Sequence, residues 1–148
     1  MEKHFNPAPE LMQLNFLIGN WHSEGELLAN SSRPSVRISG TDSYEWVAGG
    51  FFILHRVDVL MGDEPVEVIE LIGYDPLSNT YSMKSFDNKG EFTMMEANID
   101  PLRRLHISGE MVRSTLVPGK DGNKMTASWD RTDDGSTWIP WIEMKFIK

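Results

Sequence analysis

Leu14-Asn15-Phe16-Leu17-Ile18-Gly19-Asn20-Trp21-His22-Ser23-Glu24-Gly25 is the stretch of the 148-residue sequence that decides the fold. The apolar residues before Gly19 span too short a distance for a long helix, so they predict one or two helical turns. Gly19 adds no side chain where the chain bends into a strand, and Trp21 points to the same side of that strand. We therefore expect the turns to plug one end of a β-barrel whose floor includes Gly19, Trp21 and Lys145. Lys145 or Lys148 is expected to place a cation over the Trp21 ring.

Composition and charge exclude several classes of function. The formal net charge is −8, from 22 acidic and 14 basic residues, which disfavours nucleic acid and membrane surfaces as partners. No apolar run approaches the roughly 20 residues that cross a bilayer, and the N-terminus lacks the apolar segment of a signal peptide, so we expect a cytoplasmic protein. The chain has no cysteine, which excludes disulfides, thiolate metal sites and a cysteine nucleophile. Its length fits one domain over residues 1–148, with an extended arm at residues 1–10.

Short segments separated by Gly, Asn, Asp and Pro predict about ten strands. The expected ranges are 19–28, 36–47, 51–61, 66–74, 79–86, 91–98, 102–108, 110–117, 123–131 and 137–147. Even spacing, short loops and the lack of crossover helices favour an antiparallel up-and-down barrel over a sandwich or a parallel sheet, because closure removes exposed edges. The predicted fold class is therefore all-β, an antiparallel barrel of about ten strands with a short N-terminal helical plug.

These motifs also resemble a known family. Phe16–Trp21, followed by Gly25, resembles the Gly-x-Trp start of the calycin barrels, which are the lipocalins and fatty-acid-binding proteins. Combined with Gly40–Arg56 and Leu71–Pro76, this start is similar to the uncharacterised bacterial family called domain of unknown function 1579. The resemblance covers residues 11–148 and implies a lipocalin-like closed barrel with an internal cavity and no established activity.

Motifs for metal binding and catalysis are not found in the sequence. The four histidines form neither a His-x-His nor a His-Glu-x-x-His pattern, so no metal site is predicted. Heme-binding relatives of the nitrobindin kind place an axial His late in the chain, whereas no His follows His106 here, so we expect no cofactor. There is also no nucleophile elbow, phosphate-binding loop or dinucleotide fingerprint. His55, among apolar neighbours, is either a core histidine with a partner or a ligand contact.

Glu70 interrupts an apolar alternation over residues 66–72, on a face that is expected to turn inward. A buried carboxylate costs several kcal/mol unless it is paired or protonated, so an inward Glu70 requires a partner. The candidate partners are His55, Arg56, Arg104 and Tyr81. In the alternative register, the strand is turned over, so that Ile69 and Leu71 lie inside and Glu67 lies in solvent.

Aromatic and methionine side chains are spread over many of the expected strands, and a barrel of about ten strands leaves room between them. We therefore predict a lumen that binds a small apolar or amphipathic ligand. The candidate lining residues are Tyr44, Trp46, His55, Glu70, Tyr81, His106 and Trp129. One alternative is an enzyme that uses Glu70 or His55 as a general acid or base. Another is a homodimeric interaction module with a filled barrel, associating through Trp138 and Trp141.

Overall fold

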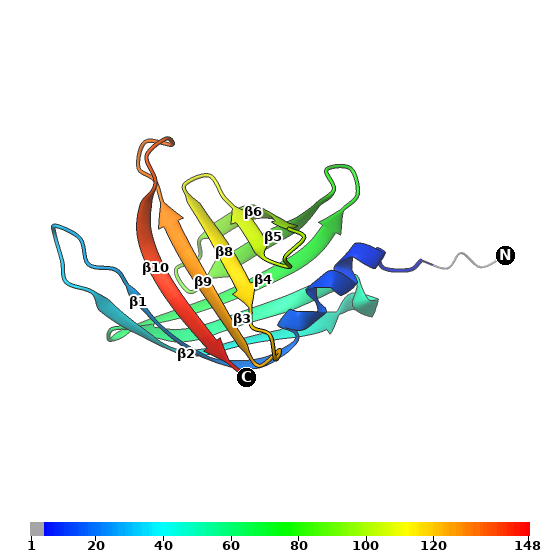
Figure 1. The fold of residues 1–148 in the computed structure, drawn as a ribbon, viewed down its shortest axis with the longest axis horizontal. Helices are drawn as coiled ribbons and strands as arrows, with labels where there is room; N and C mark the ends of the chain where they lie inside the picture. Colours follow the sequence, from blue (N-terminus) through cyan, green and yellow to red (C-terminus); the bar gives the residue numbers. More distant parts are fainter. Residues whose placement is uncertain (1–4) are drawn as a thin grey trace.

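The computed structural model describes residues 5–148 and shows a closed barrel of ten antiparallel strands (Figure 1). The elements are η1 (Pro9–Leu17), β1 (Gly19–Leu27), β2 (Val36–Val47), η2 (Ala48–Gly50), β3 (Phe52–Met61), β4 (Glu64–Asp75), β5 (Thr80–Asp87), β6 (Phe92–Ile99), β7 (Leu105–Ser108), β8 (Val112–Pro118), β9 (Lys124–Arg131) and β10 (Ile139–Ile147). Each strand pairs with the next along the chain, and β1 pairs with β10 to close the barrel. The predicted fold class is confirmed.

The strand boundaries depart most from prediction at β7. This strand begins at Leu105 rather than at residue 102, because Asp100 holds the preceding residues in a turn. One carboxylate oxygen of Asp100 accepts hydrogen bonds from the backbone N–H groups of Leu102, at 2.9 Å, and Arg104, at 3.0 Å. The expected extended arm at residues 1–10 is also shorter, because η1 already begins at Pro9; its residues 1–4 lie outside the described part of the chain.

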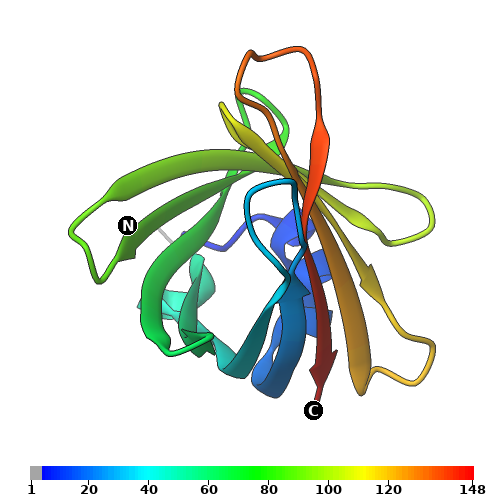
Figure 2. The same ribbon diagram turned by 90° about the vertical axis from the view of Figure 1, so that its left-hand side faces the viewer.

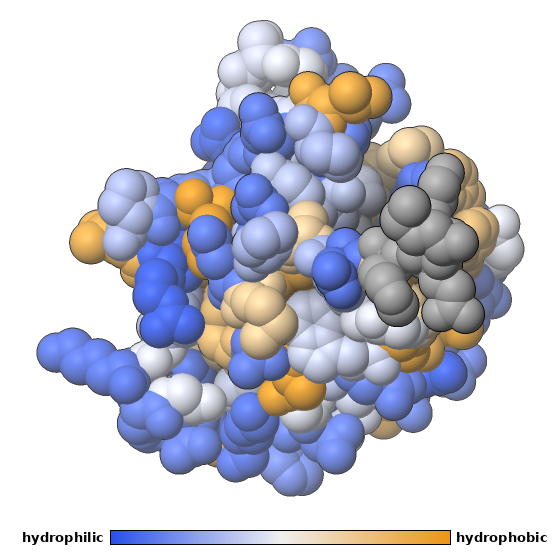
Figure 3. All heavy atoms as spheres, turned by 90° about the vertical axis from the view of Figure 1, so that its right-hand side faces the viewer, coloured by the Kyte–Doolittle hydropathy of each residue, from blue (hydrophilic) through white to orange (hydrophobic). Residues whose placement is uncertain are grey.

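Side chains of η1 and Trp21 close one end of the barrel, as the opening stretch predicted. Leu14, Leu17 and Trp21 are at most 1% exposed. The Trp21 indole N–H donates a hydrogen bond of 2.8 Å to the Leu17 carbonyl, which fixes the end of the helix over the strand. The Tyr81 hydroxyl donates one of 2.6 Å to the Glu10 carbonyl and so fixes the beginning. Figure 3 shows the molecule from this side, where hydrophilic and hydrophobic residues are mixed on the surface.

Lys148, not Lys145, covers the ring of Trp21. Its ammonium nitrogen lies 5.1 Å from the ring centre, within the range of a cation–π contact. Gly19 makes this approach possible, because a Cβ at Gly19 would collide with the Lys148 side chain. The expectation that Lys145 forms part of the floor is wrong: Lys145 alternates with the buried Phe146 and is therefore exposed on the outer face.

The opposite end of the barrel is more open. There, apolar side chains that alternate with outward-facing residues, and so face the lumen, are still partly exposed. These side chains are Leu27, Val57, Val66, Val68, Trp129 and Ile142. Figure 2 looks from this side, with η1 behind the ring of strands. These inward side chains are therefore in contact with solvent at the end that η1 does not cover. Within residues 5–148, no helix is long and apolar enough to span a membrane.

Candidate functional site

Polar side chains from four adjacent strands meet inside the barrel, above the closed end. Ser23 comes from β1, Asp42 and Tyr44 from β2, His55 from β3 and Glu70 from β4. Each occupies an inward position of its strand, and the register sets Tyr44 beside His55 and His55 beside Glu70. We call these five residues the lumen cluster. It joins three of the predicted lining residues, namely Tyr44, His55 and Glu70.

Glu70 faces inward, so the first of the two predicted registers of β4 is the observed one. Glu70 is 4% exposed, whereas its neighbours Ile69 and Leu71 lie on the outer face and are 47% and 40% exposed. Of the partners considered for its carboxylate, His55 is the one that the structure supplies. Strand β4 keeps this orientation although it buries a carboxylate and exposes two apolar side chains, because its other inward-facing residues pack in the core.

His55 lies between two buried carboxylates. Its Nε2 is 2.6 Å from Asp42 Oδ2, and its Nδ1 is 2.9 Å from Glu70 Oε1. Asp42 is 5% exposed, and its second oxygen accepts a hydrogen bond of 2.5 Å from the Ser23 hydroxyl. The Tyr44 ring stacks on the imidazole, with ring centres 4.0 Å apart and planes 8° from parallel. The imidazole is therefore fixed along both edges and on one face.

This geometry makes His55 a cation, with only 13% of its side chain exposed. A carboxylate only accepts hydrogen bonds, so both ring nitrogens must donate, and this requires the imidazolium form. Burial by itself lowers the pKa of His55, but hydrogen bonds and charges from Asp42 and Glu70 outweigh burial and raise the pKa to about 9. Burial, followed by the same two charges, raises the pKa of Tyr44 well above its usual value, so its phenol stays neutral.

The lumen cluster is not arranged to hold a metal ion. The two carboxylates approach opposite edges of the imidazole, so neither can share an ion with the ring nitrogen that the other one contacts. In the part of the chain that the structure describes, no group of three or more His, Asp or Glu side chains forms such a site elsewhere.

The other predicted lining residues have different positions. Trp46 and Tyr81 face inward but bind η1: the Trp46 indole N–H donates to the Asn15 side-chain oxygen at 3.1 Å, as the Tyr81 hydroxyl does to the Glu10 carbonyl. Burial raises the pKa of Tyr81 to about 12, so this hydroxyl keeps its proton at neutral pH. Trp129, on β9, faces the lumen and is partly exposed.

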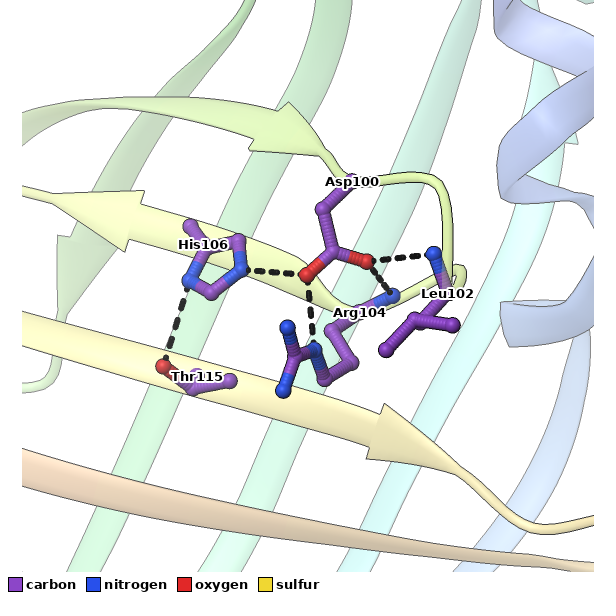
Figure 4. A network of polar contacts seen from close by, with 5 residues as sticks. All are labelled: Asp100, Leu102, Arg104, His106 and Thr115. Carbon is purple, nitrogen blue, oxygen red and sulfur yellow. Dashed lines mark hydrogen bonds and ion pairs between the residues drawn. The ribbon is translucent and has the colours of Figure 1, made fainter.

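His106 is not a lining residue, and the prediction that it faces the cavity is wrong. It alternates with the buried Leu105 and therefore points away from the lumen, with 45% of its side chain exposed. Its Nε2 donates to Asp100 Oδ2 at 2.8 Å, and its Nδ1 is 3.4 Å from the Thr115 hydroxyl (Figure 4). Asp100 also accepts from Arg104 Nε at 2.6 Å. The hydrogen bond from His106 is the main reason that the pKa of Asp100 lies well below its usual value. This network stabilises the β6–β7 turn.

Two hollows lie on the outer face of the barrel. The larger, of about 580 Å³, crosses β4 to β7 and is bordered by outward side chains such as Lys84, Met94 and Glu96. The smaller, of about 180 Å³, crosses β7 to β9 beside His106 and Arg113. Neither contains a residue of the lumen cluster, and both are open to solvent. We place the candidate site at the lumen cluster because, among residues 5–148, only there are charged side chains buried together.

Asp42 and Ser23 were not predicted as site residues. Asp42 occupies the same inward face of β2 as the buried Ile38 and Tyr44, so it interrupts an apolar alternation as Glu70 does. That pattern could have indicated it. Ser23 gives no comparable signal, because a small hydroxyl side chain is common on either face of a strand. Only the contact between β1 and β2 identifies it.

The fold and the site together define a class of protein: a closed ten-strand antiparallel barrel, plugged by an N-terminal helix, with a charged cluster inside its lumen. Residues 6–148 match the family described as "Protein of unknown function (DUF1579)". The chain belongs to this family, and the predicted family resemblance is confirmed to that extent.

Among solved structures, the chain is similar to Rv2717c from M. tuberculosis, which is known from a crystal structure. The sequences are 11% identical, the TM-score is 0.70, and the match covers 97% of this chain and 99% of that chain. At this identity, the likeness concerns the fold alone. None of the curated proteins compared with the chain matches it.

Proposed function

We propose that the lumen binds a small, largely apolar organic molecule, whose polar end rests on the lumen cluster. The observation that carries the proposal is the cluster itself. Taking charged groups out of water costs several kcal/mol each, and hydrophobic residues of similar volume often serve stability better. A set of buried charges that faces the inside of the barrel therefore supports a binding role better than a purely structural one.

The wall between the cluster and the open end supports an apolar ligand. Val57, Val68, Trp129 and Ile142 face inward and remain partly exposed. Covering such surface contributes about 25 cal/mol for each Å² removed from water. A few polar groups at the bottom of an apolar site are the usual composition of a small-molecule pocket. The proposal also agrees with the resemblance to calycin barrels, which stays a prediction.

The enzymatic alternative has one observation in its favour, which is a buried carboxylate facing the lumen. General acid or base catalysis by His55 is poorly supported, because both ring nitrogens are occupied by carboxylates. This role would pass to Glu70, whose Oε2 makes no hydrogen bond within residues 5–148. A turnover that Glu70→Gln abolishes would favour the enzyme over the binding protein.

A homodimer is better supported by the outer face of β4 to β6 than by the two tryptophans. Trp138 and Trp141 are partly buried, and the Arg113 guanidinium lies 4.4 Å from the Trp138 ring centre. By contrast, Phe86 and Phe92 are each 52% exposed and pack on one another, with ring centres 5.0 Å apart. Light scattering tests this alternative: a monomer at working concentration would contradict it.

Binding in the lumen is tested with the neutral apolar dye Nile red and two variants of neighbouring residues on β4. Val68 faces the lumen and Ile69 faces outward. If the dye enters the barrel, Val68→Phe should weaken its fluorescence enhancement at least several-fold, because the larger ring fills the lumen, whereas Ile69→Phe should leave it unchanged. Equal binding by both variants, or no binding by the wild type, would overturn the proposal. Native mass spectrometry before and after organic extraction would then identify any ligand carried from the cell.

A further inference from the structure

We propose that the ligand of the lumen carries a protonated amine, which lies against Glu70 Oε2 and the Tyr44 hydroxyl. This inference rests on the proposed function and adds the chemical class of the ligand's polar end. It depends on two independent observations, which are the charge balance of the lumen cluster and its unused hydrogen-bonding groups.

The charges of the cluster do not balance. Asp42 and Glu70 contribute two carboxylates, and the doubly hydrogen-bonded His55 contributes one positive charge. Among residues 5–148, no Lys or Arg lies within ion-pair distance of either carboxylate. The formal charge of the lumen cluster is therefore −1. A single cation from outside would neutralise it, and neutralisation matters most where water does not screen the charge.

The unused hydrogen-bonding groups are those that an ammonium group requires. Both oxygens of Asp42 are occupied, one by Ser23 and the other by His55. In the described part of the chain, Glu70 Oε2 and the Tyr44 hydroxyl make no hydrogen bond, although the two residues are only 4% and 6% exposed. Among residues 5–148, Ser114 Oγ is the one side-chain polar atom that is both fully buried and without a hydrogen-bond partner. Because Glu70 Oε2 and the Tyr44 hydroxyl also lack a partner, neither of them can be fully buried. Two acceptor oxygens on inward-facing side chains thus keep some exposed surface and no hydrogen-bond partner.

The same groups discriminate against other ligands. A carboxylate on the ligand would face a cluster that is already negative, because His55 is paired with both carboxylates and, among residues 5–148, no Lys or Arg forms an ion pair with them. A neutral hydroxyl could donate one hydrogen bond to Glu70 but would leave the excess charge in place. An alkylammonium group has three N–H donors and a positive charge, so it can satisfy both acceptors and balance the cluster.

Three six-carbon probes of similar size test the inference by isothermal titration calorimetry at pH 7: hexylamine, 1-hexanol and hexanoate. Hydrogen bonds to charged groups contribute about 1.5–3 kcal/mol, so hexylamine should bind roughly ten-fold or more tightly than either of the others. Glu70→Gln should remove this preference and bring hexylamine close to 1-hexanol. Glu67→Gln is the matched control, because Glu67 is an exposed residue on the outer face of the same strand; it should keep the preference.

Tyr44→Phe provides a second variant if Glu70→Gln does not fold. It keeps the ring that stacks on His55 and should weaken hexylamine binding roughly two- to ten-fold through the lost hydroxyl. Equal or tighter binding of 1-hexanol or hexanoate by the wild type would refute the amine and leave the binding function intact. If no probe binds and Nile red does not either, the proposed function itself fails.

Discussion

Deprotonation of His55 should destabilise the folded protein by about 3 kcal/mol between pH 6.5 and pH 9. Folding raises the pKa of His55 from 6.5 to about 9, and each pKa unit corresponds to about 1.4 kcal/mol. A raised pKa means that the native state binds the proton more tightly than the unfolded chain does. The contribution is therefore complete below pH 6.5 and disappears as the pH passes the folded-state value. The titratable groups that contact His55 are Asp42 and Tyr44 from β2 and Glu70 from β4.

Urea unfolding, followed by tryptophan fluorescence from pH 6 to pH 10, measures this effect. Other groups also titrate near pH 10, so the quantity to compare is the stability difference between the wild type and His55→Gln. This difference should shrink by about 3 kcal/mol across the range. His106→Gln removes a histidine from the outer face, and its free energy of unfolding should decrease with pH as that of the wild type does. A difference that stays constant from pH 6.5 to pH 9.5, or a His55 pKa near 6.5 by NMR, would refute the ion-pair geometry.

Three further substitutions test the closed end. Trp21→Phe keeps most of the ring but removes the indole N–H that binds the Leu17 carbonyl, and should cost about 1–3 kcal/mol in urea unfolding; an unchanged midpoint would mean that this hydrogen bond adds nothing. Gly19→Ala should cost on the order of 1–3 kcal/mol, because Gly19 has φ of +135° and a Cβ would displace Lys148; wild-type stability would contradict this. Tyr81→Phe should speed hydrogen exchange in η1 selectively, since it releases the start of that helix; uniform exchange throughout the chain would argue against such an anchor.

The fold could be predicted largely because it depends on local patterns. Alternation along each strand, turn residues between strands and the apolar stretch before Gly19 act over a few residues each, and all ten strands were placed. The start of β7 was misplaced because the Asp100 turn depends on contacts with Arg104 and His106, which have no periodic signal. Lys148 was considered as the cover of Trp21, but choosing it over Lys145 required the register of β10.

The sequence by itself determined that Glu70 and His55 are unusual, because each interrupts an apolar run where a buried polar group needs a partner. It could not determine which partner, since period-two alternation permits either face, and cross-strand pairing depends on register. The tertiary structure decided that His55 lies between Glu70 and Asp42, and that His106 faces outward. The physical reason is one of distance along the chain: Asp42, His55 and Glu70 are separated by 13 and 15 residues, and only hairpin register brings them within hydrogen-bond reach.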